Sequence, residues 1–152
     1  MWDSLFGIAN VWAMVCWAAL IVLPRTKLLQ SAVFYAGIGL FCLAYVVLLV
    51  LLLTGSLNGR AVEGASDPSF QTIEGVRGIF MSDGGVTVGW IHYLAFDLFA
   101  GLWIAKDADQ KGFSRWLQAP VLLITFVAGP AGLLAWLAIR ERRARRNARV
   151  KR

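Results

Sequence analysis

Two ionisable side chains lie within an apolar stretch of the sequence, and together they could donate and accept a proton. The stretch runs from Trp90 to Gly101 and contains the chain's only histidine, His92, and a lone carboxylic acid, Asp97. An Asp at the centre of a membrane-spanning helix costs roughly 2.5–3.5 kcal/mol on insertion scales, so it usually has a partner, a wet cavity or a function. We therefore take His92, Asp97 and the preceding Glu74 as candidate catalytic residues for acid–base chemistry.

His92 and Asp97 cannot share one helix face, because residues five apart lie about 140° apart around an α-helix. If they cooperate, they do so across a bound ligand or through neighbouring helices. The sequence therefore predicts a crevice with Glu74 at its mouth, and no His–Asp dyad.

Other kinds of site lack support in the sequence. Cys16 and Cys42 have neither the close pairing nor the nearby His that a zinc site needs. His92 has no Ser or Cys neighbour in a motif of nucleophilic catalysis. We expect neither a metal nor a cofactor.

The composition is that of an integral membrane protein. Hydrophobic residues make up 59% of the chain and the mean hydropathy is +0.65, whereas apolar residues including Gly make up about 45–50% of a soluble domain. The net charge is +6, but eight of the fifteen Lys and Arg residues lie from Arg140 onward. The charge therefore marks a tail and does not indicate nucleic-acid binding.

Four apolar runs are long enough to cross a membrane, which takes about 17–25 residues. They predict spans at residues 6–23, 32–54, 86–105 and 120–139, so the fold class is all-α, an integral membrane four-helix bundle in one domain, residues 1–139. Gly129-Pro130 falls in the middle of the fourth span, where proline removes a backbone donor and bends the helix. Since the freed carbonyl needs a donor, the kink should face the bundle interior.

Between the second and third spans, the sequence predicts an amphipathic interfacial helix over residues 68–82. Asp67-Pro68 supplies an N-cap and a first helical residue. Glu74 and Arg77, three residues apart, could pair on this helix. Its apolar face follows from spacings of three and four between Phe70, Ile73, Val76 and Phe80.

The segment from Arg140 to Arg152 predicts a basic cytoplasmic tail that attracts anionic lipid, by about 1 kcal/mol per basic residue. Four spans place both termini on one side, and the positive-inside rule makes that side the cytoplasm. Arg25 and Lys27 argue for the opposite arrangement. Because no Ser- and Arg-rich transit peptide precedes the first span, we expect a bacterial inner membrane.

Several pieces of the sequence resemble the neoxanthin synthase family, the abscisic acid-deficient type of small four-helix membrane proteins. The most specific is the Trp-x-His-(x)4-Asp-Leu-Phe run that starts at Trp90. The others are residues 73–80, Asp107, residues 129–132, Asn10 and residues 17–24. In plants this family is associated with making the allenic carotenoid neoxanthin from the diepoxide violaxanthin. The resemblance implies a membrane isomerase acting on a carotenoid or related isoprenoid.

The residues fit the chemistry that this resemblance implies. Converting an epoxide into an allenic alcohol needs a general acid at the epoxide oxygen and a base at a polyene carbon. Burial-tuned carboxyl groups and an imidazole could serve. Aromatic residues of the third span could line a polyene slot, although the same residues could simply pack the bundle. The candidate ligand-binding residues are Trp90, Phe96, Phe99, Trp103, Arg77 and Asn10.

A non-catalytic alternative stays open. The protein could bind a pigment or lipid, form a homo-oligomer, or pack against a larger membrane complex, with its polar residues joining helices. A transporter is a third possibility, but four short spans would have to oligomerise to enclose a path.

Overall fold

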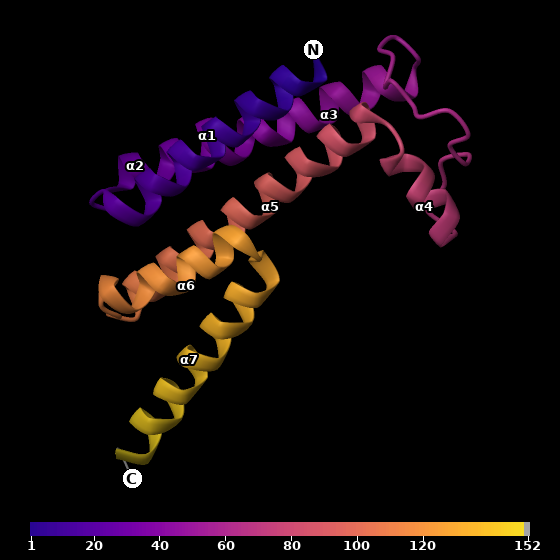
Figure 1. Cartoon of the computed structure of the whole chain (residues 1–152). Coiled ribbons are helices and arrows are strands. Elements are labelled where there is room, and N and C mark those ends of the chain that lie inside the picture. The colour runs from indigo at the N-terminus through magenta and orange to yellow at the C-terminus, as the bar shows by residue number, and fades with distance from the viewer. Residues whose placement is uncertain (151–152) are drawn as a thin grey trace.

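The computed structural model describes residues 1–150, with side chains as far as Arg143, and the regular elements in that range are all helices (Figure 1). The predicted all-α class is confirmed. The end of the predicted tail lies outside the described residues. The helices are α1 Trp2–Val22, α2 Lys27–Ala32, η1 Val33–Gly39, α3 Leu40–Leu53, α4 Ile73–Phe80, α5 Asp83–Gln110, α6 Arg115–Val127 and α7 Gly129–Val150.

Within the described range, three helices are long and apolar enough to cross a membrane: α1, the continuous helix Lys27–Leu53, and α5. The turn between the first two follows from Pro24, which cannot continue α1, and from Thr26, whose hydroxyl accepts from the Leu29 N–H at 3.1 Å to begin α2. The π-helix η1 lies in the first half of the second apolar helix. There the Trp12 indole N–H of α1 donates to the Ala36 carbonyl at 2.9 Å.

The helix α5 is the central element, because it packs against α1, η1, α3, α6 and α7. Figure 1 shows it between the layer of α1 and α3 and the pair α6 and α7. Its side chains Leu98, Ile104 and Ala105 are fully buried. Gly101 lets α5 approach α1 closely, since a Cβ there would overlap the Trp17 ring. The residues of the apolar stretch are thus held on the most enclosed helix.

The predicted fourth span is wrong as a single kinked helix. α6 ends at Val127, Ala128 takes an extended conformation (φ −151°, ψ 82°), and α7 starts at Gly129 and packs back against α6. Pro130 is the second residue of α7, in the first turn, where a missing N–H costs nothing. Gly129-Pro130 therefore starts a new helix. At 13 residues, α6 is about 20 Å long, which is too short to cross a hydrocarbon layer of about 30 Å.

The two ends of the chain lie at opposite ends of the bundle (Figure 1). Near the N-terminus, the Trp2 indole donates to the Asn58 carbonyl at 3.0 Å, beside the loop after α3. At the far end, Arg140 of α7 lies 3.4 Å from Asp107 near the end of α5. The prediction that both termini share one side of a membrane stays a prediction; three crossings and a hairpin in place of four crossings would put them on opposite sides.

The predicted interfacial helix is shorter than residues 68–82. α4 covers Ile73–Phe80, and its N-cap is Thr72, whose hydroxyl accepts from the Gly75 N–H at 3.0 Å. Asp67-Pro68 is not the helix start. The intervening segment folds back instead, with the Ser69 N–H bonded to the Gly75 carbonyl at 3.1 Å.

A polar network that the sequence did not reveal joins the α1–α2 turn to α5 and α6. The Arg25 side chain is only 4% exposed and lies 3.0 Å from Asp109, which is 34% exposed. The fully buried Gln118 amide donates to the same carboxylate at 2.9 Å. Burial lowers the pKa of the Arg25 guanidinium from its ordinary value, and Asp109 partly offsets this. The network fixes the end of the bundle away from the N-terminus.

Candidate functional site

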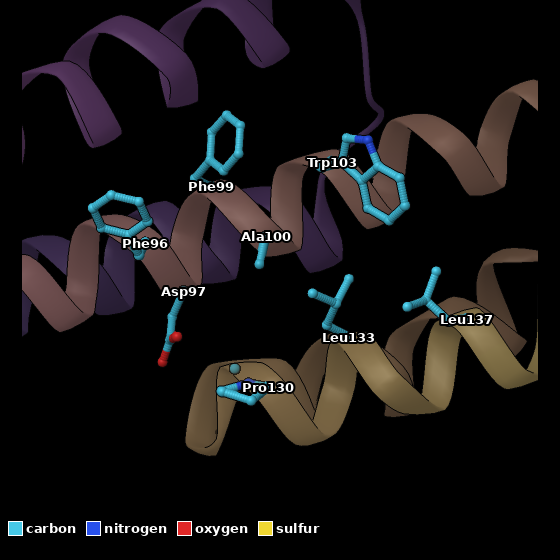
Figure 2. Close-up of a pocket in the computed structure, with 9 residues that line it drawn as sticks. Phe96, Asp97, Phe99, Ala100, Trp103, Pro130, Leu133 and Leu137 are labelled. Atoms are coloured by element: carbon cyan, nitrogen blue, oxygen red, sulfur yellow. The ribbon is translucent and has the colours of Figure 1, made fainter.

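A crevice of about 620 Å³ lies between the middle of α5 and the first turns of α7. Figure 2 shows its two sides: the Asp97 carboxyl group and Ala100 point from α5 toward α7, and Leu133 and Leu137 point from α7 toward α5. The break between α6 and α7 creates it, because α7 leaves α5 at an angle from this point (Figure 1). Its lining consists of Phe96, Asp97, Phe99, Ala100, Trp103, Gly129, Pro130, Leu133 and Leu137.

Asp97 is the polar side chain of this crevice. The residue is 6% exposed, and its Oδ2 is buried without a hydrogen-bond partner among the described residues. In Figure 2 its carboxyl group points toward the start of α7, beside Pro130. A buried polar atom without a partner calls for an explanation, and in a membrane-spanning helix the default explanation is a functional site.

The start of α7 is shaped around this carboxyl group. A Cβ on Gly129 would overlap the Asp97 carboxyl oxygens, so only glycine leaves them room there. The N-terminus of α7 also turns its positive dipole end toward this region. The sequence signal Gly129-Pro130 thus belongs to the same site as Asp97.

Tyr93 is a site residue that the sequence analysis missed. It lies one helical turn before Asp97, and its hydroxyl donates to the Val127 carbonyl at 3.0 Å. That carbonyl is at the end of α6, where the helix leaves it without an intrahelical partner. The spacing of four residues from Asp97 could have indicated a shared face.

His92 does not line the crevice. It is exposed on another face of α5, with its ring centroid 5.4 Å from that of Tyr45 on α3 and 4.7 Å from that of Phe96. The structure therefore does not bring it together with Asp97. Phe96 alone lies both beside the imidazole and in the crevice wall.

Glu74 is also remote from Asp97, because α4 packs near the N-terminal end of α5 (Figure 1). Its carboxylate pairs with Arg77 at 2.7 Å and accepts from the Ser66 hydroxyl at 3.1 Å. Both partners of this ion pair are largely exposed. The predicted role of Glu74 at the mouth of a shared site has no geometric support.

The remaining candidates divide between the crevice and the helix packing. Phe96, Phe99 and Trp103 line the crevice. Trp90 instead donates to the Asn10 amide oxygen at 3.0 Å, which joins α5 to α1. Across the described part of the chain, no three His, Cys, Asp or Glu side chains gather in a way that could hold a metal ion.

A protein-family model described as ABA DEFICIENT 4-like matches residues 4–136. The chain belongs to the ABA4-like family. The resemblance to the abscisic acid-deficient type of membrane protein is thereby confirmed. A search of curated proteins and a search of solved structures each found no match.

The region matched to the ABA4-like family contains both sides of the break between α6 and α7 and the whole polar part of the crevice. In this ABA4-like protein, Asp97 is the one of the three predicted catalytic residues that lines the apolar crevice, and the Tyr93 hydroxyl lies one helical turn away. Such a site can bind a long apolar molecule and move a proton at one point along it.

Proposed function

We propose that this ABA4-like protein binds a carotenoid or related isoprenoid in the crevice between α5 and α7 and isomerises an oxygenated end of it. The observation that carries the proposal is the buried, unpartnered Oδ2 of Asp97 in a crevice of about 620 Å³ with otherwise apolar walls. A polyene fits such walls, and one polar group suffices to orient its oxygenated end.

The carboxyl group of Asp97 can perform both halves of the isomerisation. In its neutral form, one oxygen donates a proton to the epoxide oxygen while the C–O bond next to the polyene breaks. The other oxygen accepts the proton of the adjacent polyene carbon, and the electrons of that C–H bond form the new double bond of the allene. The carboxyl group ends neutral, so the step needs no redox partner.

The neighbours of Asp97 assist by position. Gly129 leaves the room that the Asp97 carboxyl group occupies at the start of α7. Phe99 and Trp103 continue the lining from Asp97 along α5. The side chains of Leu133 and Leu137 point from α7 toward α5 (Figure 2). This arrangement excludes water from the reacting end, which prevents hydrolysis of the epoxide.

The test is pigment analysis in a host that accumulates violaxanthin. We expect the wild-type protein to form an allenic product and Asp97→Asn to lower its rate by about 10²–10⁴-fold, the usual contribution of a general acid or base. His92→Ala is the matched control, since it alters an ionisable residue of the same helix outside the crevice; its rate should stay within a few-fold of wild type. Equal product from Asp97→Asn and wild type would refute the proposal.

A non-catalytic pigment- or lipid-binding protein is the second candidate, and the open side of the crevice favours it. Phe96 and Phe99 are exposed along this side, so a bound molecule could exchange with the bilayer. A pigment that co-purifies with wild-type protein, unchanged in structure, would support this candidate over the isomerase. Leu133→Trp, which fills the crevice, should then abolish co-purification.

We further propose that the C-terminus is cytoplasmic and the N-terminus lies across the membrane. Among the described side chains, those of Arg25, Lys111 and Arg140 interact at the end of the bundle that holds the α5–α6 turn, and Lys27 and Lys106 line a hollow there. The positive-inside rule assigns this end to the cytoplasm. Arg25 and Lys27 now agree with the tail. In a bacterial inner membrane, the tail would then meet anionic lipid.

A further inference from the structure

A second hollow, of about 400 Å³, lies between α2, η1 and the end of α5. It shares no lining residue with the crevice. It is at the end of the bundle that holds the α5–α6 turn, since Lys106 lies in the last turns of α5 and Lys27 begins α2. We name it the lysine hollow, lined by Lys27, Gln30, Ser31, Phe34, Tyr35 and Lys106.

The two lysines give the hollow an uncompensated positive charge. No described carboxylate lies within 4.0 Å of the Lys27 or Lys106 ammonium group, whereas Arg25, Lys111 and Arg140 at this end have acidic partners. Lys111 pairs with Asp107, and Arg25 with Asp109. The nearby acids are therefore already engaged, and the lysines remain available to an external anion.

Two neutral polar side chains, those of Gln30 and Ser31, complete the polar end of the hollow. The Gln30 amide donates to the Arg25 carbonyl at 3.2 Å, which anchors that side chain. Ser31 adds a hydroxyl group from the same helix. A phosphate group accepts hydrogen bonds from ammonium and hydroxyl donors alike.

The other end of the hollow is apolar and faces the bilayer. Phe34 and Tyr35 are exposed, and their rings pack edge to face with centroids 5.1 Å apart. They stand at the start of η1, and π-helical turns occur frequently at functional sites. The helix Lys27–Leu53 is the least enclosed of the three long apolar helices, because only 17% of its most apolar stretch is buried. A ligand with a charged headgroup and an acyl chain matches a hollow that is polar at one end and apolar at the other.

We propose that the lysine hollow binds the phosphate group of an anionic phospholipid, with the acyl chain along Phe34 and Tyr35. Lys27 and Lys106 come from different helices, so the bound headgroup would tie the start of α2 to the end of α5. Both lysines lie near helix ends, at the depth of lipid headgroups. A zwitterionic headgroup adds a cation that the lysines repel, so the site selects a net negative charge.

The test is native mass spectrometry of the purified protein with phosphatidylglycerol, phosphatidylcholine or inorganic phosphate. We expect retained phosphatidylglycerol, and a loss of about 30-fold in affinity for Lys27→Gln/Lys106→Gln, at about fivefold for each lysine. Lys27→Arg/Lys106→Arg should restore binding and shows that the positions tolerate substitution. Lys111→Gln/Arg142→Gln removes two charges outside the hollow and should retain the lipid.

Three results would overturn the proposal. Equal losses in the hollow variant and the Lys111→Gln/Arg142→Gln control would assign the binding to diffuse charge. Equal retention of phosphatidylcholine would exclude selection of a negative headgroup. Displacement of the lipid by inorganic phosphate at the same concentration would make free phosphate the ligand.

Discussion

Replacing Asp97 by Asn should separate stability from function. The substitution keeps the shape of the side chain and removes a carboxyl group whose Oδ2 is buried without a partner among the described residues. A buried acceptor left unsatisfied costs about 1–3 kcal/mol. An amide is cheaper to bury than a carboxyl group that can ionise, so we expect Asp97→Asn to raise the free energy of unfolding by about 1 kcal/mol.

Thermal unfolding in detergent, followed by tryptophan fluorescence, measures this effect. For a chain of this size, about 1 kcal/mol corresponds to a rise in Tm of about 2–4 °C. Asp97→Asn should therefore be more stable than wild type while losing the pigment conversion. A fall in Tm of several degrees would refute the reasoning, because it would show that Asp97 holds the helices together.

Three further predictions follow from the packing. Gly129→Ala should destabilise the protein by about 1–3 kcal/mol in thermal unfolding and block pigment conversion, because its Cβ would overlap the Asp97 carboxyl group. The control Gly7→Ala, whose Cβ meets open space, should leave stability and conversion unchanged. Arg25→Ala should lower the free energy of unfolding by about 2–3 kcal/mol, which is less than the loss of about 3–5 kcal/mol for a fully buried pair because Asp109 is one-third exposed. Arg60→Ala, at an exposed ion pair, should lower it by under about 1 kcal/mol. Equal losses in the two variants would contradict the buried network. Reporters fused to the two termini should give opposite orientations, and matching signals would restore the four-crossing topology.

The fold was largely predictable from sequence because long apolar runs can satisfy their backbone groups in a membrane only as helices or closed barrels. The break at Ala128 was not. A Gly-Pro pair can kink a helix or start a new one, and the outcome depends on partners from elsewhere in the chain. Here the Tyr93 hydroxyl donates a hydrogen bond to the Val127 carbonyl, and the absence of a side chain on Gly132 lets α7 pack closely against Thr125 of α6.

The candidate site was predictable only in part for a similar reason. Helical geometry showed that His92 and Asp97 face different directions, but it could not say which direction leads into a crevice. That depends on where α7 lies, and therefore on the break. The sequence analysis assigned Glu74 to the site because a carboxyl group suits acid–base chemistry. Its position on α4 instead gives it Arg77 as an ion-pair partner.

The most direct test of the account compares Asp97→Asn with His92→Ala in purified protein supplied with violaxanthin in lipid vesicles. The account predicts an allenic product from wild type and from His92→Ala, and a loss of about 10²–10⁴-fold in its rate of formation with Asp97→Asn. Product formation that survives in Asp97→Asn, or that disappears in His92→Ala, would contradict it.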